Sequence, residues 1–351
     1  MISAKEQVFL DKNHSSTVRP FSSSAGVTCR SRSQLLERAL VDFGADESFA
    51  NAARKIREHY GVTVSESTTR LDVEKHAKQI ERLDKKECLE YKKADAMEII
   101  GELDGSMVPI VSQKQCESRV SDKRKNKTYE WKEARLAVAR AKGRVDANYA
   151  AVIGPSCEAG DQLAKAVKRA GENIKTTIHC VADGAPWIAE QVELKFGSKA
   201  RFLLDFYHAS EYLAEASKCC NPSSPKEWLN KQQKSLKNGC AQNVFAELQK
   251  HIEHECEAND SCPALKCLNY LLKRESQLDY KAAIASDLPI GSGAVEGGHR
   301  SVIQKRLKIS GAWWRLDNAQ SMLSVRTLRA NGQWARYWTK LQTEKVGFAP
   351  G

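Results

Sequence analysis

One stretch, residues 177–208, constrains the fold more than any other part of the chain. A short apolar run ends there in Asp183 and Gly184, a helical segment follows, and a second apolar run ends in Asp205. Two apolar runs that each end in an acid, with a helix between them, predict an α/β sheet that carries carboxylates on its ligand-binding rim. Carboxylates in such a position are suited to binding a metal ion.

Composition narrows the class of protein. With 351 residues the chain is long enough for two or three domains. No apolar run reaches the roughly 18 residues of a membrane helix, and residues 1–30 are Ser-rich without a signal-peptide core, so we expect a cytoplasmic protein with no membrane partner. The net charge of +11 favours a polyanionic partner such as nucleic acid, although many ordinary basic enzymes share it. Eleven cysteines without an export signal predict reduced thiols.

The N-terminal part predicts a flexible leader (residues 1–30) followed by three short helices (31–92). We expect the first helix to stop at Gly44, the second to stop at Gly61, and Ser65 to cap the third. A tight turn before the third helix is typical of a helix-turn-helix, and an ordinary three-helix bundle is the alternative. In a helix-turn-helix the residues that contact bases would be Glu66, Ser67, Thr69 and Arg70.

Residues 93–210 predict the first part of an α/β domain. Residues 97–112 suggest two short strands around a turn at Gly105 and Ser106, and residues 128–142 suggest a third strand. Strand, helix, strand, helix and strand follow up to Asp205. Residues 211–288 then predict an all-α insertion, which contains six cysteines, His251 and His254. The spacing His-x-x-His-x-Cys suggests a zinc site, whereas the lack of paired Cys-x-x-Cys favours buried helical thiols.

The last part, residues 289–345, predicts a helical section with a cationic surface beside Glu296. Its basic residues include Arg300, Lys305, Arg306, Lys308, Arg315, Arg326, Arg329, Arg336 and Lys340, and between residues 297 and 340 only Asp317 is acidic. The tryptophans at 313, 314, 334 and 338 either stack on bases or pack inward, and we expect inward packing for at least two.

Three acids from three separate elements form the candidate catalytic set: Asp104, Asp183 and Glu296. Each acid alone is equally suited to capping a helix or pairing with a lysine. Together they supply hard oxygen ligands that suit Mg²⁺ or Mn²⁺, and two such ions would activate an attacking group and stabilise the leaving oxygen of a phosphodiester. His208 would contact phosphate, orient a ligand or receive a proton, or have a structural role with Asp205.

These motifs resemble the DDE transposases of the bacterial ISKra4 insertion-sequence type. The matching segments are LDGSMVP, YEWKEARLA, VADGAPWI, LLDFYHASEYL and PIGSGAVEGGHRSVIQKRLKISGAWW. The resemblance covers residues 33–338 and implies an RNase H-like mixed sheet with flanking helices, in which the last catalytic acid, Glu296, follows the all-α insertion. The Asp205/His208 pair is similar to the Asp-or-Cys-x-x-His signature of Mutator-like transposases.

The resemblance implies a transposase that cleaves and joins DNA with Mg²⁺ or Mn²⁺. Its partners would be double-stranded DNA, as element ends and target, and further copies of itself on that DNA. The expected DNA contacts are Arg70, Arg300, Lys305, Arg306, Lys308 and Arg315. Two alternatives stay open: a truncated, non-catalytic DNA-binding relic that represses a full-length copy, and a structure-specific nuclease of the same fold.

Overall fold

A computed structural model describes residues 6–10, 17–24, 32–86, 95–113, 127–255 and 262–346. The chain divides into two compact units. One unit comprises residues 1–90, 108–131 and 302–351, and the other comprises residues 91–107 and 132–301. The expected C-terminal section, residues 289–345, is therefore shared between the two units.

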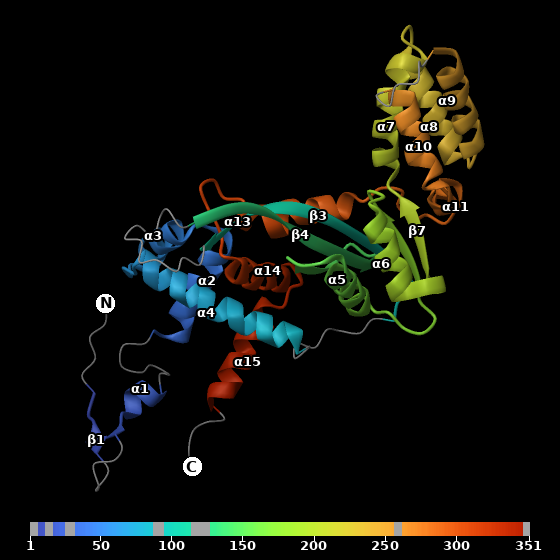
Figure 1. The fold of residues 1–351 in the computed structure, drawn as a ribbon. Coiled ribbons are helices and arrows are strands. Elements are labelled where there is room, and N and C mark those ends of the chain that lie inside the picture. Colours follow the sequence, from blue (N-terminus) through green and yellow to red (C-terminus); the bar gives the residue numbers. More distant parts are fainter. Residues whose placement is uncertain are drawn as a thin grey trace. The chain divides into compact units, whose positions relative to one another are not determined.

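A five-stranded mixed sheet forms the framework of the second unit (Figure 1). Its strands are β3 (Glu98–Gln113), β4 (Lys127–Ala141), β5 (Asn148–Val152), β6 (Thr177–Ala182) and β7 (Ala200–Leu204), in the order β5-β4-β3-β6-β7. β4 and β5 are antiparallel, whereas β3 pairs in parallel with β6 and β6 pairs in parallel with β7. The mixed α/β sheet expected from the sequence is thus present.

Two crossover helices pack on this sheet. They are α5 (Ser156–Arg169) and α6 (Pro186–Phe196), and the short 3-10 turn η1 (Gly197–Lys199) leads from α6 into β7. β6 is buried at five of its six positions, which is why its sequence is mostly apolar instead of alternating. Its core neighbours include Leu163 of α5 and Ile188 of α6.

The region around Gly105 differs from expectation. The two short strands with a turn at Gly105 and Ser106 were a wrong prediction, because β3 is one continuous strand. The glycine has a different role there: a side chain at position 105 would collide with the Glu133 carboxylate on β4. Gly105 therefore allows close approach between neighbouring strands and does not mark a turn.

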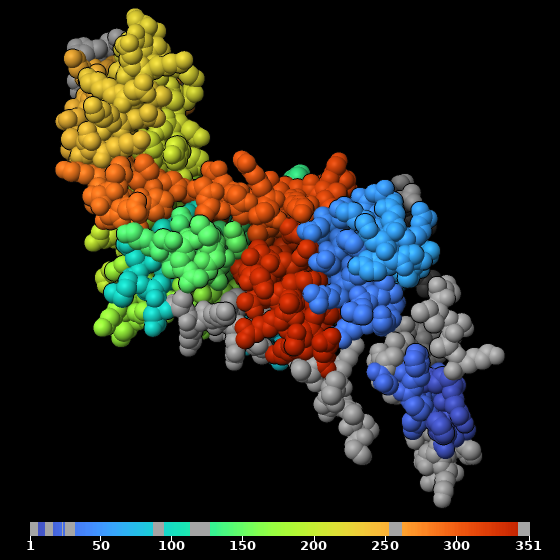
Figure 2. All heavy atoms as spheres, turned by 180° about the vertical axis from the view of Figure 1, so that it is seen from behind, coloured from blue at the N-terminus to red at the C-terminus, as the bar shows by residue number. Residues whose placement is uncertain are grey.

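The all-α insertion expected between β7 and the last acid is confirmed. Its helices are α7 (Phe206–Cys220), α8 (Pro225–Lys237), α9 (Ala241–Glu255), α10 (Pro263–Leu272) and α11 (Tyr280–Ala285), with the 3-10 turn η2 (Glu275–Gln277). These helices enclose a continuous apolar core and form the yellow and gold region of Figure 2. After the insertion come α12 (Gly293–Gly298), the π-helical segment η3 (His299–Gln304) and the short α13 (Lys305–Leu307).

The first unit is helical. It contains α2 (Gln34–Asp46), α3 (Phe49–Tyr60), α4 (Glu66–Lys85), α14 (Leu316–Ala330) and α15 (Trp334–Val346), and within the leader the short β1 (Phe9–Leu10), β2 (Thr17–Val18) and α1 (Pro20–Ser24). Ser65 caps α4 by accepting from the Thr68 N–H at 3.1 Å, and Gly61 ends α3 with φ +66°, as expected. α4 packs on α14, which places the blue and red helices side by side in Figures 1 and 2.

Gly44 does not stop the first helix, which continues to Asp46. A side chain at position 44 would overlap Val73 of α4, so this glycine permits close packing of α2 against α4. The sequence pattern alone does not distinguish these two uses of a glycine near a helix end.

Several expectations about cysteines and membrane spans have definite outcomes. Cysteines 157, 180, 219, 220, 240 and 267 are free thiols, but Cys262 is disulfide-bonded, which departs from the expectation of reduced thiols throughout. In the described part of the chain no helix is long and apolar enough to cross a membrane. Of the residues in the suggested zinc spacing, Cys256 and the side chain of His254 lie outside the described residues.

Candidate active site

Two of the predicted acids lie at the same level on neighbouring strands. β3 and β6 pair with a constant register, from Glu98 opposite Thr177 to Glu102 opposite Val181. Carried two residues further, the same register places Asp104 beside Asp183. Neighbouring strands lie about 4.8 Å apart, so the two acids mark one edge of the sheet.

The helix that carries Glu296 is fixed to β3 through two polar contacts. The Val295 N–H donates to the Glu102 carboxylate at 2.8 Å, and His299 Nε2 lies 3.1 Å from Asp104 Oδ2. Glu102 and Asp104 share one face of the strand because side chains alternate, and Val295 and His299 are one helical turn apart. α12 and the start of η3 therefore lie along this face of β3.

A buried carboxylate ties the start of the same helix to β7. Asp205 is 4 % exposed, and its Oδ2 accepts from the Ser292 hydroxyl at 2.6 Å and the Ser292 N–H at 2.7 Å. Its Oδ1 accepts from the N–H groups of Tyr207 and His208 and so caps α7. Asp205 contacts the backbone N–H of His208 and both donors of Ser292, so its role is to join the starts of α7 and α12.

Glycine at position 298 brings α12 close to the sheet. A Cβ there would lie 2.8 Å from Leu136 of β4, closer than real Cβ atoms come, and 3.2 Å from Tyr149 of β5, which is a tight contact. The close approach explains the glycine at position 298.

Glu296 itself lies exposed in the first turn of α12, one turn after Ser292 and one turn before His299. Of the residues that the structure describes, the oxygens of Asp104, Asp183 and Glu296 do not form a group in which all lie within 4.8 Å of one another. The fold thus holds the helix of Glu296 beside Asp104. The three carboxylates do not surround a single point in this structure.

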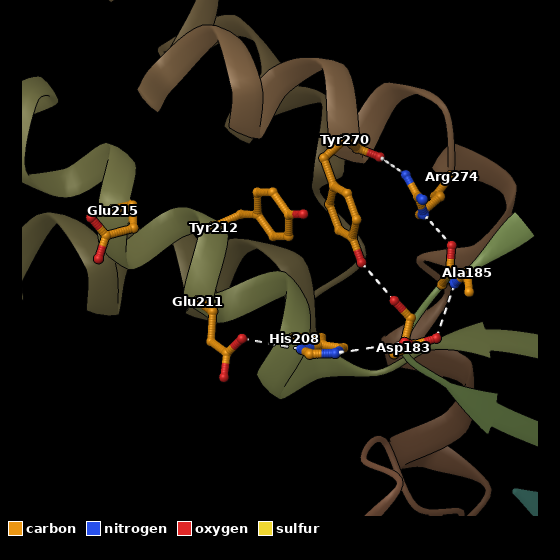
Figure 3. Close-up of a pocket in the computed structure, with 9 residues that line it drawn as sticks. Asp183, Ala185, His208, Glu211, Tyr212, Glu215, Tyr270 and Arg274 are labelled. Atoms are coloured by element: carbon orange, nitrogen blue, oxygen red, sulfur yellow. Dashed lines mark hydrogen bonds and ion pairs between the residues drawn. The ribbon is translucent and has the colours of Figure 1, made fainter. Parts of the chain in front are cut away.

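His208 lies in an open pocket of 470 Å³ beside Asp183 (Figure 3). Its Nε2 is 4.0 Å from Asp183 Oδ2 and its Nδ1 is 3.1 Å from Glu211 Oε2, so the imidazole bridges two carboxylates. The remaining lining residues are Gly184, Ala185, Tyr212, Glu215, Tyr270 and Arg274. Three acids in the lining make this pocket suited to a cation or a donor group.

The insertion fixes the backbone around Asp183. The Tyr270 hydroxyl donates to the Asp183 carbonyl at 2.8 Å, and Arg274 Nε donates to the Gly184 carbonyl at 2.8 Å. Gly184 has φ +76°, and a side chain there would overlap Leu204, so both conformation and space require glycine. Tyr212 stacks on Tyr270 with ring centroids 3.8 Å apart. The Asp-Gly signature after β6 is therefore held from the side of the all-α insertion.

Glu102 is the most perturbed acid of this region. It is 2 % exposed, and burial raises its pKa from 4.5 to about 7 in spite of the Val295 N–H bond and the charge of Arg140. This carboxyl group changes protonation near neutral pH and lies two residues before Asp104 on the same strand. The sequence analysis did not identify it as part of the site. The alternation of Glu102 and Asp104 within one strand was the available signal.

The predicted DNA contacts differ in their exposure to solvent. Arg70, Arg300, Lys305, Lys308 and Arg315 are exposed. Lys305 lies 3.7 Å from Asp46, and Arg70 lies 3.7 Å from Glu74. Among the expected base contacts, Glu66 and Ser67 are also exposed, but Thr69 is fully buried and donates to the Ser65 carbonyl.

Arg306 is removed from the set of DNA contacts. It is 2 % exposed, stacks against Phe49 and Trp314 at 4.7 and 4.6 Å, and donates to the Gly44 carbonyl at 2.8 Å. Aromatic faces and a carbonyl satisfy this guanidinium inside the first unit, so it is a packing residue.

Arg326 and Arg329 also form ion pairs within the first unit. Arg326 is buried against Asp46 and the Ala45 carbonyl, and Arg329 lies 3.1 Å from Asp42 and 3.0 Å from Asp46. The cationic surface is thus smaller than the sequence indicates. Trp314 and Trp338 are buried, as expected for at least two of the four tryptophans, whereas Trp313 is 42 % exposed beside Tyr129 and Trp131.

Comparison with known proteins gives a family without an assigned activity. A family model described as "Uncharacterised protein family (UPF0236)" matches residues 27–343. Among curated relatives, UPF0236 protein TTE0402 and UPF0236 protein TTE2489 of Caldanaerobacter subterraneus subsp. tengcongensis are each 30% identical over 158 residues, 44% of this chain. Those alignments cover 30% and 31% of the relatives, so the matched region spans about a third of their length.

Among solved structures, a Drosophila P element transposase strand transfer complex aligns over 92% of this chain and 83% of that chain, at 10% identity and a TM-score of 0.30. A TM-score this low does not establish a shared fold.

Proposed function

This chain belongs to the uncharacterised protein family UPF0236, and we propose that it is a DDE-type transposase that binds insertion-sequence ends and cuts and joins DNA. One observation carries the proposal. The β3–β6 register, carried two residues past its last pair, sets Asp104 opposite Asp183, and on either side of Glu296 the Val295 N–H donates to Glu102 while His299 Nε2 lies 3.1 Å from Asp104 Oδ2. This arrangement supports the proposal that three acids remote in sequence act at one edge of the sheet.

The order of the strands supports the same proposal. In β5-β4-β3-β6-β7 the first strand of the domain is central, with the next two strands on one side and two parallel strands on the other. This order supports the RNase H-like core that the resemblance to ISKra4-type transposases implies. The insertion of α7–α11 before the helix of Glu296 agrees with the same resemblance.

Asp104, Asp183 and Glu296 would hold the divalent ions, Mg²⁺ or Mn²⁺. The fit rests on their chemistry: all three supply hard oxygen donors, Asp104 and Asp183 are about one-third exposed, and Glu296 is exposed. When bound, two such ions activate the attacking group and stabilise the leaving oxygen of a phosphodiester. The protein itself would orient the acids. His299 Nε2 lies 3.1 Å from Asp104 Oδ2, His208 Nε2 lies 4.0 Å from Asp183 Oδ2, and the Ala185 N–H donates to Asp183 Oδ1.

DNA binding is proposed for exposed residues of each unit. The start of α4, with Glu66, Ser67 and Arg70, has the cap and exposure of a recognition helix. Basic residues that suit phosphate contacts are Lys305, Lys308 and Arg315 in the first unit and Arg300 in the second. Assembly of several copies on paired ends belongs to the same proposal.

The test is cleavage of a supercoiled plasmid that carries the element's ends, with Mg²⁺ or Mn²⁺. We expect cutting at the ends by the wild-type chain and none by Asp183→Asn or Glu296→Gln. Asp161→Asn, on the exposed face of α5, is the matched control and should cut normally. Equal cutting by all four proteins contradicts the assigned acids, and cutting of branched DNA without preference for the ends favours a nuclease.

A second candidate, a non-catalytic DNA-binding relic, is favoured by one observation. Within the described residues the oxygens of Asp104, Asp183 and Glu296 do not all lie within 4.8 Å of one another. End binding that persists in EDTA, with no cleavage in any divalent metal, supports the relic and opposes the transposase.

A further inference from the structure

Three metal-ligating side chains meet in the all-α insertion, away from the acids at the sheet edge. Cys219 and Cys220 are the last two residues of α7, and His251 lies in α9. Their ligand atoms, two Sγ and one imidazole nitrogen, all lie within 4.8 Å of one another. Within the described ranges no other group of His, Cys, Asp and Glu side chains meets this criterion.

A third thiol lies next to this group. Cys267 of α10 is fully buried and belongs to the apolar core against which Cys219 and Cys220 pack.

Buried helical thiols frequently serve only as small apolar side chains, which was the interpretation favoured from the sequence. That role explains Cys180, which lies alone in the sheet core. It does not explain why a half-buried imidazole faces two adjacent thiols at ligand spacing, because an imidazole gains little from apolar neighbours. Two thiols and an imidazole form a donor set that suits zinc.

We propose that Cys219, Cys220 and His251 bind one Zn²⁺ ion, with Cys267 as the nearest thiol for the fourth position. Binding as thiolates releases one proton from each coordinating cysteine, while His251 binds as the neutral ring. Zinc–sulfur distances of about 2.3 Å and zinc–nitrogen distances of about 2.0–2.1 Å place the ligand atoms of a tetrahedral site about 3.5–3.8 Å apart, so atoms within 4.8 Å of one another need to draw in by at most about 1 Å.

The site would act as a structural cross-link between the end of α7 and α9. α7 begins at the Asp205 cap and carries His208 and Glu211. Soft thiolate ligands select zinc, whereas the carboxylates at the sheet edge suit Mg²⁺ or Mn²⁺, so the two sets of residues call for different metals. This inference does not depend on the proposed transposase activity.

The test uses the full-length chain, purified under a metal-free phosphine reductant. We expect one equivalent of zinc by elemental analysis after dialysis, and a thiolate-to-cobalt charge-transfer band after replacement with Co²⁺. Cys220→Ser and His251→Asn should each lower zinc affinity by about 10-fold or more. Cys240→Ser and Cys157→Ser are matched controls at exposed free thiols and should bind zinc like the wild-type chain.

Two results would overturn the site. One is a wild-type chain, reduced and saturated with metal, that shows no thiolate-to-cobalt band. The other is unchanged zinc affinity in both Cys220→Ser and His251→Asn. Circular dichroism of each variant establishes that it is folded, and the wild-type cobalt spectrum decides the question if a variant does not fold.

Discussion

Glu102 couples the stability of the sheet to pH, because the folded chain buries its carboxyl group almost completely. Burial raises its pKa from 4.5 to about 7, against the opposing effects of the Val295 N–H and Arg140. In the unfolded chain the group titrates near 4.5. Between these two pH values the folded state holds a proton that the unfolded state has lost.

The sign and size of the effect follow from that difference. Stability from Glu102 is fully present below pH 4.5 and is lost as pH rises through about 7, because deprotonation then requires a buried charge. At about 1.4 kcal/mol per pH unit, the difference corresponds to about 3 kcal/mol in the free energy of unfolding.

Glu102→Gln tests this reasoning. The amide oxygen can still accept from the Val295 N–H, and the side chain stays neutral at every pH. The compared quantity is the free energy of unfolding of the variant minus that of the wild-type chain. We expect this difference to be up to about 3 kcal/mol larger at pH 8 than at pH 4.5. Urea unfolding between pH 4.5 and 8 measures it, with Glu98→Gln as control, since Glu98 on the same strand pairs with Lys142. A constant difference between variant and wild type across this range would refute the argument.

Three further predictions concern residues whose contacts are visible only in the structure. Asp205→Ala should lower the free energy of unfolding by about 3 kcal/mol, because it leaves the Ser292 donors buried and α7 uncapped; Ser292→Ala should cost less, and equal losses in urea titrations would contradict this. Arg306→Ala should destabilise the first unit by about 2 kcal/mol while Lys308→Ala leaves stability unchanged; weaker DNA binding by a fully folded Arg306→Ala protein would return this arginine to the DNA surface. His208→Asn should reduce metal-dependent cleavage by about 10- to 100-fold with DNA affinity unchanged, whereas the loss of affinity alone, in gel-shift assays, would make it a phosphate contact.

Local patterns predicted what depends on neighbours in sequence. The strand-end positions of Asp183 and Asp205, the caps at Ser65 and Gly61 and the helical insertion all follow from periodicity and turn chemistry within a few residues. The turn assigned to Gly105 failed because the reason for that glycine, Glu133, lies on another strand.

Long-range partners account for the remaining differences. The sequence analysis counted Arg326 as part of the cationic surface because its carboxylate partner, Asp46, is 280 residues away in the chain. His299 was not assigned to the site for the same reason, since Asp104 lies on the first strand of the sheet. A sequence places such residues on helices and strands, but only tertiary packing decides which charges are neutralised and which side chains face a site.

The central claim is that Asp104, Asp183 and Glu296 act together on a phosphodiester. Single-turnover cleavage of a radiolabelled DNA end in Mg²⁺ tests it most directly, with Asp104→Asn, Asp183→Asn and Glu296→Gln compared with Asp161→Asn under equal DNA occupancy. The account predicts that each of the three substitutions lowers the rate by at least about 100-fold, and that combining two of them lowers it little further, because the acids act as one unit. Independent, small effects that simply multiply, or a normal rate in Glu296→Gln, would contradict it.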